Sequence, residues 1–304
     1  MKIQQSANII PLHQDCSPDL TRIKVCVTCN RQTMPDRLTD CPQCFTVAIQ
    51  ANTGTGITEH MNDTDLKQYR VWDRPTRLFH WINFSCIVGL LIFGLLMLYK
   101  KELGITSMEA KISLKTVHVI IGYVFVLNLL FRIVWGFIGN RYARWSAILP
   151  GRGFSQALRD YRASLSTGSP KQYLGHNPLG RLAIVTMFLL MLIMAVTGLI
   201  RAGTDIYYPP FGSAVAEYIA APGTDPASLI PYDPEGTDPA KAERLKAIKG
   251  PIGDIHIYTA FTLLFVIVVH IIAVIVMDSR EGGSLISAMF TGTKVLSGKP
   301  VDDS

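Results

Sequence analysis

Four long apolar segments constrain the fold of this chain more than any other feature of its sequence. They cover residues 80–99, 116–139, 181–200 and 256–277. Each is close to the ~20 residues that an α-helix needs to cross the ~30 Å hydrocarbon layer of a bilayer. None alternates with a period of two, so the pattern predicts helices rather than strands. We therefore expect an all-α membrane protein built on a four-transmembrane-helix bundle.

The composition favours lipid rather than water as the surroundings of much of the chain. Of the 304 residues, 49% are hydrophobic and 17% are charged, whereas soluble domains carry about 25% charged residues. A net charge of +6 could indicate nucleic-acid binding, but the Lys and Arg residues gather beside the apolar segments. Basic residues in that position are orientation signals. We therefore expect a lipid bilayer as partner and no nucleic acid.

The distribution of basic residues also predicts the orientation. The segment between the second and third helices is strongly basic, with Asp160 as its one acid, and the segment before the first helix is basic as well. The segment at 201–255 is rich in Pro, Gly and Asp, which predicts a loop of about 55 residues, and it is net acidic. Because cytoplasmic loops carry the excess of Lys and Arg, both termini are predicted to be cytoplasmic. The four lysines between the first two helices oppose this orientation.

Two Cys-x-x-Cys pairs near the N-terminus predict a metal site. No apolar leader precedes them, so we expect no cleavable secretory signal and a reducing environment for the thiols. The spacing suits tetrahedral coordination of zinc by thiolates, with a rubredoxin-like iron site as the alternative. We expect a flexible N-terminus at 1–25, a zinc-ribbon-like module at 26–48 and a linker at 49–70. The predicted ligands of the one zinc are Cys26, Cys29, Cys41 and Cys44.

Histidines within the apolar segments indicate a functional site. Four of the seven histidines lie there, and ionisable residues at membrane depth are costly enough to mark function by default. His256 and His270 are fourteen residues apart, which is ~40° short of four full turns and a rise of ~21 Å along a helix. One helix therefore presents two imidazoles on one face, one near each side of the bilayer.

The depths of the other two histidines complete two pairs. His80 opens the first apolar segment and His118 lies at the start of the second. With the predicted orientation, depth pairs His80 with His270 on the cytoplasmic side and His118 with His256 on the outer side. Two bis-imidazole sites result. Two histidines on one iron leave no open position, which favours electron transfer over oxygen chemistry.

Arg132 and His176 allow two interpretations each. Arg132 follows His118 by fourteen residues, so it falls on the same helix face at the inner depth. Its charge could be matched by a haem propionate, or the side chain could snorkel to the interface. His176 precedes the third helix in a sequence that is typical of a helix-initiating turn, and we favour that role over metal ligation.

The chain resembles the bacterial cytochrome b561 and nickel–iron hydrogenase cytochrome b family. Four segments carry the resemblance in order: RPTRLFHW at 74–81, HVIIGYVFVLNLLFRIVWGFIGNRYARW at 118–145, GHNPLG at 175–180 and the helix of His256 and His270. It covers roughly residues 70–295, within a predicted membrane domain at 71–295 that a tail at 296–304 follows. The resemblance implies two b haems, bound by His80, His118, His256 and His270. The N-terminal cysteine module of this chain departs from the family pattern.

The resemblance also implies a function. Such a protein would be an electron-transfer subunit of an oxidoreductase complex, a multi-pass protein of the bacterial inner membrane. It would carry electrons between the quinone pool and a partner redox protein. We expect that partner, hydrogenase-like or a c-type cytochrome, to dock on the periplasmic side, over the acidic segment at 201–255. The alternative from another class is a membrane anchor that presents the zinc module to a cytoplasmic partner. A small transporter is disfavoured because the sequence shows no repeated broken helices.

Overall fold

The computed structural model describes residues 66–167, 170–281, 284–296 and 298–303, together with two N-terminal strands. It divides into two compact units, Met1–Asp63 and Thr64–Ser304. In the first unit, β1 (Arg22–Cys26) and β2 (Cys44–Ala48) pair antiparallel, with Cys26 opposite Cys44. Cys29 and Cys41 lie outside the described residues, and with them the predicted zinc site.

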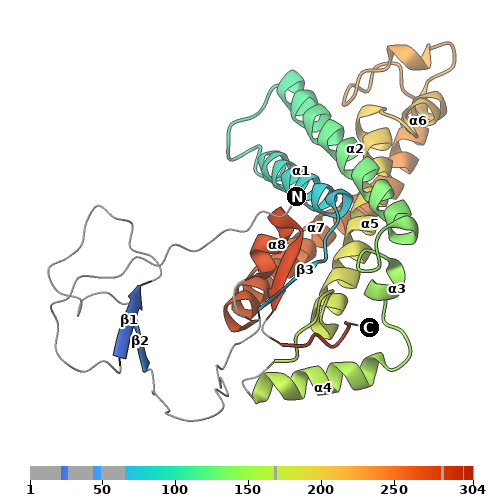
Figure 1. The fold of residues 1–304 in the computed structure, drawn as a ribbon. Coiled ribbons are helices and arrows are strands. Elements are labelled where there is room, and N and C mark those ends of the chain that lie inside the picture. Colours follow the sequence, from blue (N-terminus) through green and yellow to red (C-terminus); the bar gives the residue numbers. More distant parts are fainter. Residues whose placement is uncertain are drawn as a thin grey trace, which may run out of the picture. The chain divides into compact units, whose positions relative to one another are not determined.

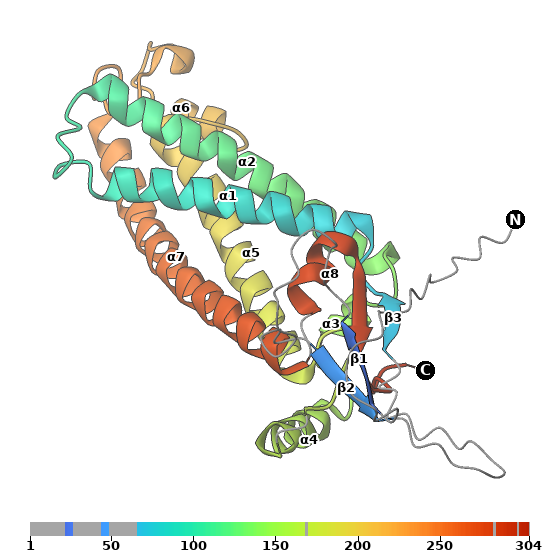
Figure 2. The same ribbon diagram turned by 60° about the vertical axis from the view of Figure 1, so that its left-hand side comes forward.

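The second unit is the predicted helical bundle. Its long helices are α1 (Arg74–Leu98), α2 (Met108–Ile138), α5 (Pro178–Ile206) and α7 (Pro239–Glu281) (Figure 1). In the described part of the chain, these four are the helices long and apolar enough to cross a membrane. α1 packs along α2, α2 along α5 and α5 along α7, as Figure 2 shows from a second side. The predicted four-helix membrane architecture is confirmed.

The helices extend further than the apolar segments that predicted them. α1 begins at Arg74 because the Asp73 side chain caps it, accepting the Thr76 N–H at 2.9 Å. α7 begins at Pro239 rather than at residue 256, since its first turns are rich in Ala, Lys, Glu and Leu, which favour helix without being apolar. The predicted boundaries were wrong where polar helix formers continue a membrane span.

The predicted 55-residue loop at 201–255 is therefore largely structured. α5 continues to Ile206, and α7 includes the residues from Pro239 onward. The short helix α6 (Gly212–Ile219) lies between them. Ala216, Ile219 and Leu229 form a small buried cluster there. This loop covers one end of the bundle, at the top of Figure 1.

The opposite end of the bundle holds the short elements. α3 (Trp145–Ile148) and α4 (Phe154–Ser166) follow α2, and α8 (Leu285–Thr291) follows α7. Strands β3 (Lys67–Arg70) and β4 (Thr293–Leu296) pair antiparallel beside α8. The predicted linker at 49–70 thus ends earlier than expected, because its last four residues form β3.

The predicted tail at 296–304 is also part of this end. Asp302 accepts the N–H groups of Leu174 and Gly175 at 2.6 and 2.9 Å, just before α5. Lys294 is buried and donates to the carbonyls of Tyr173 and Gly175. The C-terminal segment is therefore hydrogen-bonded to the chain that leads into α5.

A layer of buried apolar side chains crosses the middle of the bundle. Large apolar residues elsewhere on the four helices are mostly exposed, which places them toward lipid. Leu263 belongs to the layer and lies seven residues from both His256 and His270. The layer thus separates the two predicted sites. Its members are Cys86, Phe125, Leu129, Met191, Ala195 and Leu263.

Candidate functional site

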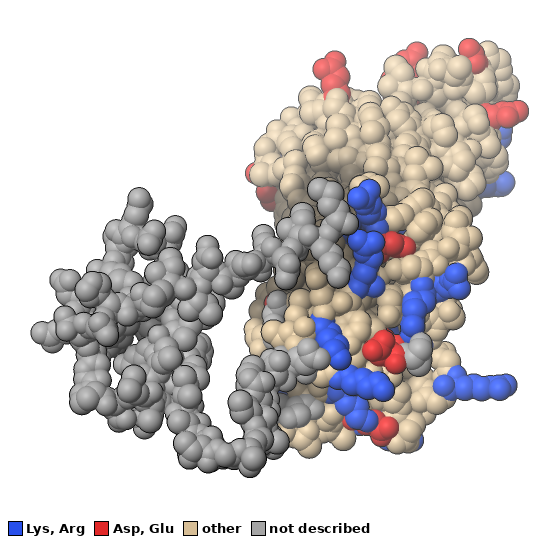
Figure 3. Space-filling model, viewed as in Figure 1, with Lys and Arg blue, Asp and Glu red and all other residues tan. Residues whose placement is uncertain are grey.

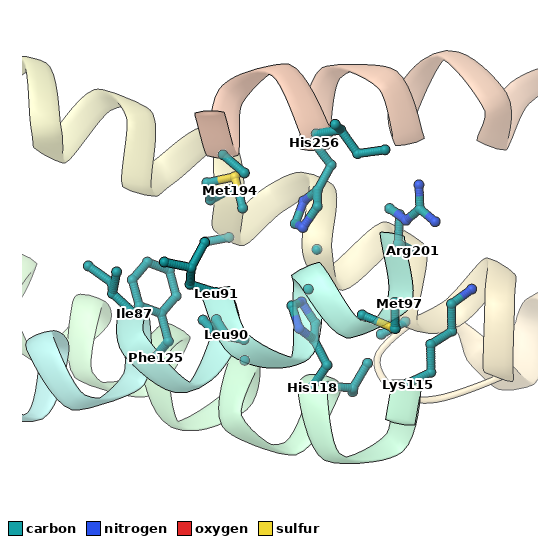
Figure 4. Close-up of a pocket in the computed structure, with 18 of the residues that line it drawn as sticks. Ile87, Leu90, Leu91, Met97, Lys115, His118, Phe125, Met194, Arg201 and His256 are labelled. Carbon is teal, nitrogen blue, oxygen red and sulfur yellow. The ribbon is translucent and has the colours of Figure 1, made fainter. Parts of the chain in front are cut away.

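The predicted outer pair comes together across a cavity. His118 of α2 and His256 of α7 point toward each other from opposite walls (Figure 4). Their ring centroids are 6.4 Å apart and their planes are inclined at 70°. The cavity has a volume of about 460 Å³ and residues of all four long helices line it. Such a volume suits a ligand of cofactor size.

Thr197 on α5 determines how the His256 ring presents its nitrogens. The Thr197 hydroxyl lies 2.9 Å from His256 Nδ1 and donates to the Ile193 carbonyl at 2.7 Å. A hydroxyl has one proton to donate, so it accepts the Nδ1–H of His256. The Nε2 atom then keeps its lone pair, which is the state needed for a metal ligand.

Two glycines make room for the facing rings. A Cβ at Gly198 would lie 3.4 Å from His256 Cε1, and one at Gly94 would lie 3.6 Å from His118 Cε1. Gly122 also lines the cavity, and the nearest atom to an added Cβ there is Leu90 Cδ2 at 4.0 Å. Small residues on three helices thus keep side chains out of the space around the histidines.

The predicted inner pair consists of His80 on α1 and His270 on α7. His270 lies within electrostatic range of His80 and also of His176. The Nδ1 atom of His80 is buried without a hydrogen-bond partner. His80 lies more than one turn into α1, because the cap at Asp73 starts that helix earlier than expected. The facing rings of His118 and His256 agree with the predicted outer pairing, and the inner pairing stays a prediction.

Arg132 lies inside the bundle rather than at its surface. It is 3% exposed, and its Nη2 donates to the Ala143 carbonyl at 2.9 Å. The guanidinium carbon lies 5.3 Å from the Trp145 ring centroid and 5.4 Å from that of Phe188. Its Nη1 is buried without a partner. The side chain does not snorkel, and it retains a donor for an anion.

His176 occupies the helix-initiating turn that its sequence predicted. Asn177 caps α5 by accepting the Gly180 N–H at 2.7 Å, and Pro178 is its first residue. The His176 ring packs on Trp72 at 4.7 Å between centroids. Burial, followed by the charges of Lys294 and Arg132, lowers the pKa of His176 to about 3. The ring is therefore neutral at physiological pH.

A charged cluster, which no sequence pattern predicts, lies at the outer end of the cavity. The Asp205 carboxylate is 9% exposed and pairs with Lys115 at 2.6 Å, Arg201 at 2.9 Å and Lys249 at 3.5 Å. Asp205 belongs to the last turn of α5, within the segment that the sequence predicts to be a loop. Among the described residues, no three His, Cys, Asp or Glu side chains gather as a metal site.

Comparison with known proteins finds a matching family and several similar proteins. The family model described as prokaryotic cytochrome b561 matches residues 71–292. A probable Ni/Fe-hydrogenase B-type cytochrome subunit of Rhizobium leguminosarum bv. viciae is 27% identical over 240 residues, which cover 74% of this chain and 88% of the relative. Its counterpart in Cupriavidus necator is 25% identical over 252 residues, covering 79% and 92%.

A shorter match extends to Escherichia coli. The probable Ni/Fe-hydrogenase 1 B-type cytochrome subunit of strain K12 is 30% identical over 151 residues. The match covers 46% of this chain and 62% of the relative. The region shared with that protein is therefore less than two thirds of its length.

Proposed function

This chain belongs to the prokaryotic cytochrome b561 family, and from that premise we propose that it is a membrane b-type cytochrome subunit that carries electrons through two b haems. The observation that carries the proposal is the pair His118 and His256, which face each other across an apolar cavity. We assign them to an outer haem, and His80 and His270 to an inner one.

The geometry of the outer pair fits an iron between two imidazoles. A first-row metal binds an imidazole nitrogen at about 2 Å, so two facing rings could each offer one nitrogen to an iron between them. The observed centroid separation is 6.4 Å. When bound, the haem would supply reversible one-electron chemistry. The chain supplies the ligands, the ligand tautomer set by Thr197, and burial.

We propose a second haem at the inner pair on less direct grounds. The Nδ1 of His80 is buried without a hydrogen-bond partner, and the two histidines of α7 are fourteen residues apart on one helix face. Two haem sites on opposite sides of the apolar layer would give electrons a route across the bilayer. Two histidines at each site would leave no open position on the haem iron, which suits electron transfer.

Arg132 is assigned to a propionate of the inner haem, since it has a buried donor without a partner. Replacing it with glutamine should lower the reduction potential of the inner haem by several tens of millivolts and leave the outer haem nearly unchanged. A cation favours the less positive ferrous state, by about 3 kcal/mol at ~5 Å and an effective dielectric of ~20 before screening. Redox titration of the purified variant measures the shift.

Arg144→Gln is the matched control for this change. Arg144 lies at the same end of the bundle, but it is exposed and its Nε donates to the Gly139 carbonyl. The control substitution should leave the reduction potentials of both haems unchanged. Equal inner potentials in Arg132→Gln and the unmodified protein would contradict the assignment of Arg132 to a propionate.

The orientation and the partners form the finer part of the proposal. Basic side chains gather on the half of the molecule that carries α4 and α8, whereas acidic ones appear over the α6 end (Figure 3). This distribution supports cytoplasmic termini in a bacterial inner membrane. We propose that quinone exchanges electrons with one haem and that a redox protein docks over the acidic outer loop. Relatives named as hydrogenase subunits favour a hydrogenase as that partner.

The zinc module is proposed from its four cysteines, with Cys26 and Cys44 opposite each other on paired strands as its structural support. A membrane anchor that presents this module to a cytoplasmic protein remains the second candidate function. A reduced-minus-oxidised spectrum of the purified chain separates the two candidates. The cytochrome gives a b-type absorption band that quinol can elicit, and a structural anchor gives no such band.

A further inference from the structure

The outer cavity is polarised along its length. Apolar side chains such as Ile87, Leu90 and Phe125 line one end, and Lys115 and Arg201 lie at the other, beside the two histidines (Figure 4). Three basic residues and one acid line it in total, Lys100, Lys115, Arg201 and Asp205, so the formal charge of its lining is 3 − 1 = +2. An excess of cations in a partly buried, apolar site calls for an anionic ligand.

Arg201 is held next to the predicted haem ligands. Its guanidinium packs directly on the backbone of Gly253, where a Cβ would collide with Nη1. Gly253, the contact of Arg201, lies about one helical turn before His256 on α7. Lys115 lies about one helical turn before His118 on α2. The two cations therefore flank the histidine pair from two different helices.

Asp205 orients these cations without neutralising them. Its Oδ2 accepts from Lys115 at 2.6 Å and from Arg201 at 2.9 Å, while Lys249 approaches Oδ1 at 3.5 Å. Tyr232 covers Lys115, with the ammonium 5.0 Å from its ring centroid. Burial and the Asp205 carboxylate raise the pKa of Tyr232 to about 12, so its phenol adds no negative charge. One carboxylate thus holds three cations.

From this arrangement we propose that Lys115 and Arg201, positioned by Asp205, bind the two propionate carboxylates of the outer haem. The inference rests on the proposed function, since it requires a haem between His118 and His256. A b haem has an apolar macrocycle and two carboxylates at one edge. That distribution complements a cavity with apolar walls and a lining charge of +2 at one end. Asp205 lines the same cavity and is assigned as a positioning residue, which acts through Lys115 and Arg201.

The proposal predicts shifts of opposite sign in the reduction potential of the outer haem. Removal of a cation in Arg201→Gln should disfavour the ferrous state roughly three- to tenfold, which is ~30–59 mV downward for a one-electron couple. Removal of the anion in Asp205→Asn should raise the same potential. Lys246→Gln, on an exposed pair with Glu243 and outside the cavity lining, is the matched charge control and should shift neither haem.

A second measurement distinguishes propionates from another anion, such as a lipid headgroup. The full chain, produced without haem, is reconstituted with haem b or with its dimethyl ester. The unmodified chain should bind haem b at the outer site at least tenfold more tightly than the ester, and Arg201→Gln should lose most of that preference. Lys115→Gln provides the same comparison should Arg201→Gln not incorporate haem.

Two outcomes would overturn the inference: outer potentials that stay constant or move in one direction in both variants, or equal affinity for haem and ester in the unmodified chain. Arg201→Lys, which keeps the charge, should retain the potential and the preference. Failure of the proposed function has a different signature, because the unmodified chain would then bind no haem at this site.

Discussion

Replacing His118 or His256 with alanine is expected to remove the outer haem and leave the inner one bound. Each substitution deletes one of the two residues that would hold the haem iron, and the cavity lining contains no third imidazole to replace it. Haem content should fall from two to one per chain, measured as pyridine haemochrome against protein concentration. The remaining haem should keep the potential of the inner site, since the buried layer around Leu263 separates the two pairs.

His80→Ala and His270→Ala form the reciprocal set. They should remove the inner haem and leave the outer potential in place. His176→Gln is the matched control, because its ring packs on Trp72 beside the inner pair without being assigned as a ligand. That variant should keep both haems. Unchanged haem content in all four ligand variants would contradict the assignment, and loss of a haem in His176→Gln would show that the ligand set is wrong.

Replacing Cys26 or Cys44 with serine is expected to abolish zinc binding without reducing haem content. Four thiolates complete a structural zinc site, and a hydroxyl does not replace one of them. The two residues lie opposite each other on β1 and β2. Elemental analysis of the purified full chain should show one zinc per unmodified protein and almost none in the variants.

The control for the cysteine experiment is Cys86→Ala. Cys86 is buried in the apolar layer of the bundle, so this variant should keep its zinc. Iron in place of zinc, with the red colour of an iron–thiolate centre, would support the rubredoxin-like alternative. Metal-free unmodified protein would contradict the zinc module altogether.

The histidine pairs could be predicted because helix geometry is regular. The fourteen residues between His256 and His270 place both on one face, and depth in the bilayer then selects His118 and His80 as their partners. The facing rings of His118 and His256 agree with that prediction. The four membrane spans could be predicted as well, because the length of an apolar run can be compared directly with the thickness of the hydrocarbon layer.

Other features were hidden from the sequence because they depend on tertiary contacts. The polar start of α7 has no apolar pattern, so the helix from Pro239 was missed. Asp205 belonged to a presumed loop, and its pairing with Lys115 and Lys249 joins residues that are distant in sequence. The burial of Arg132 depends on the rings of Trp145 and Phe188, which meet only in the folded bundle.

The measurement that tests the central claim most directly is the haem content of the unmodified chain, combined with a potentiometric titration. The account predicts two b haems per chain, and two one-electron components in the titration that each disappear with one histidine pair. A purified, folded chain that carries no b haem, or one haem that every ligand variant retains, would contradict it.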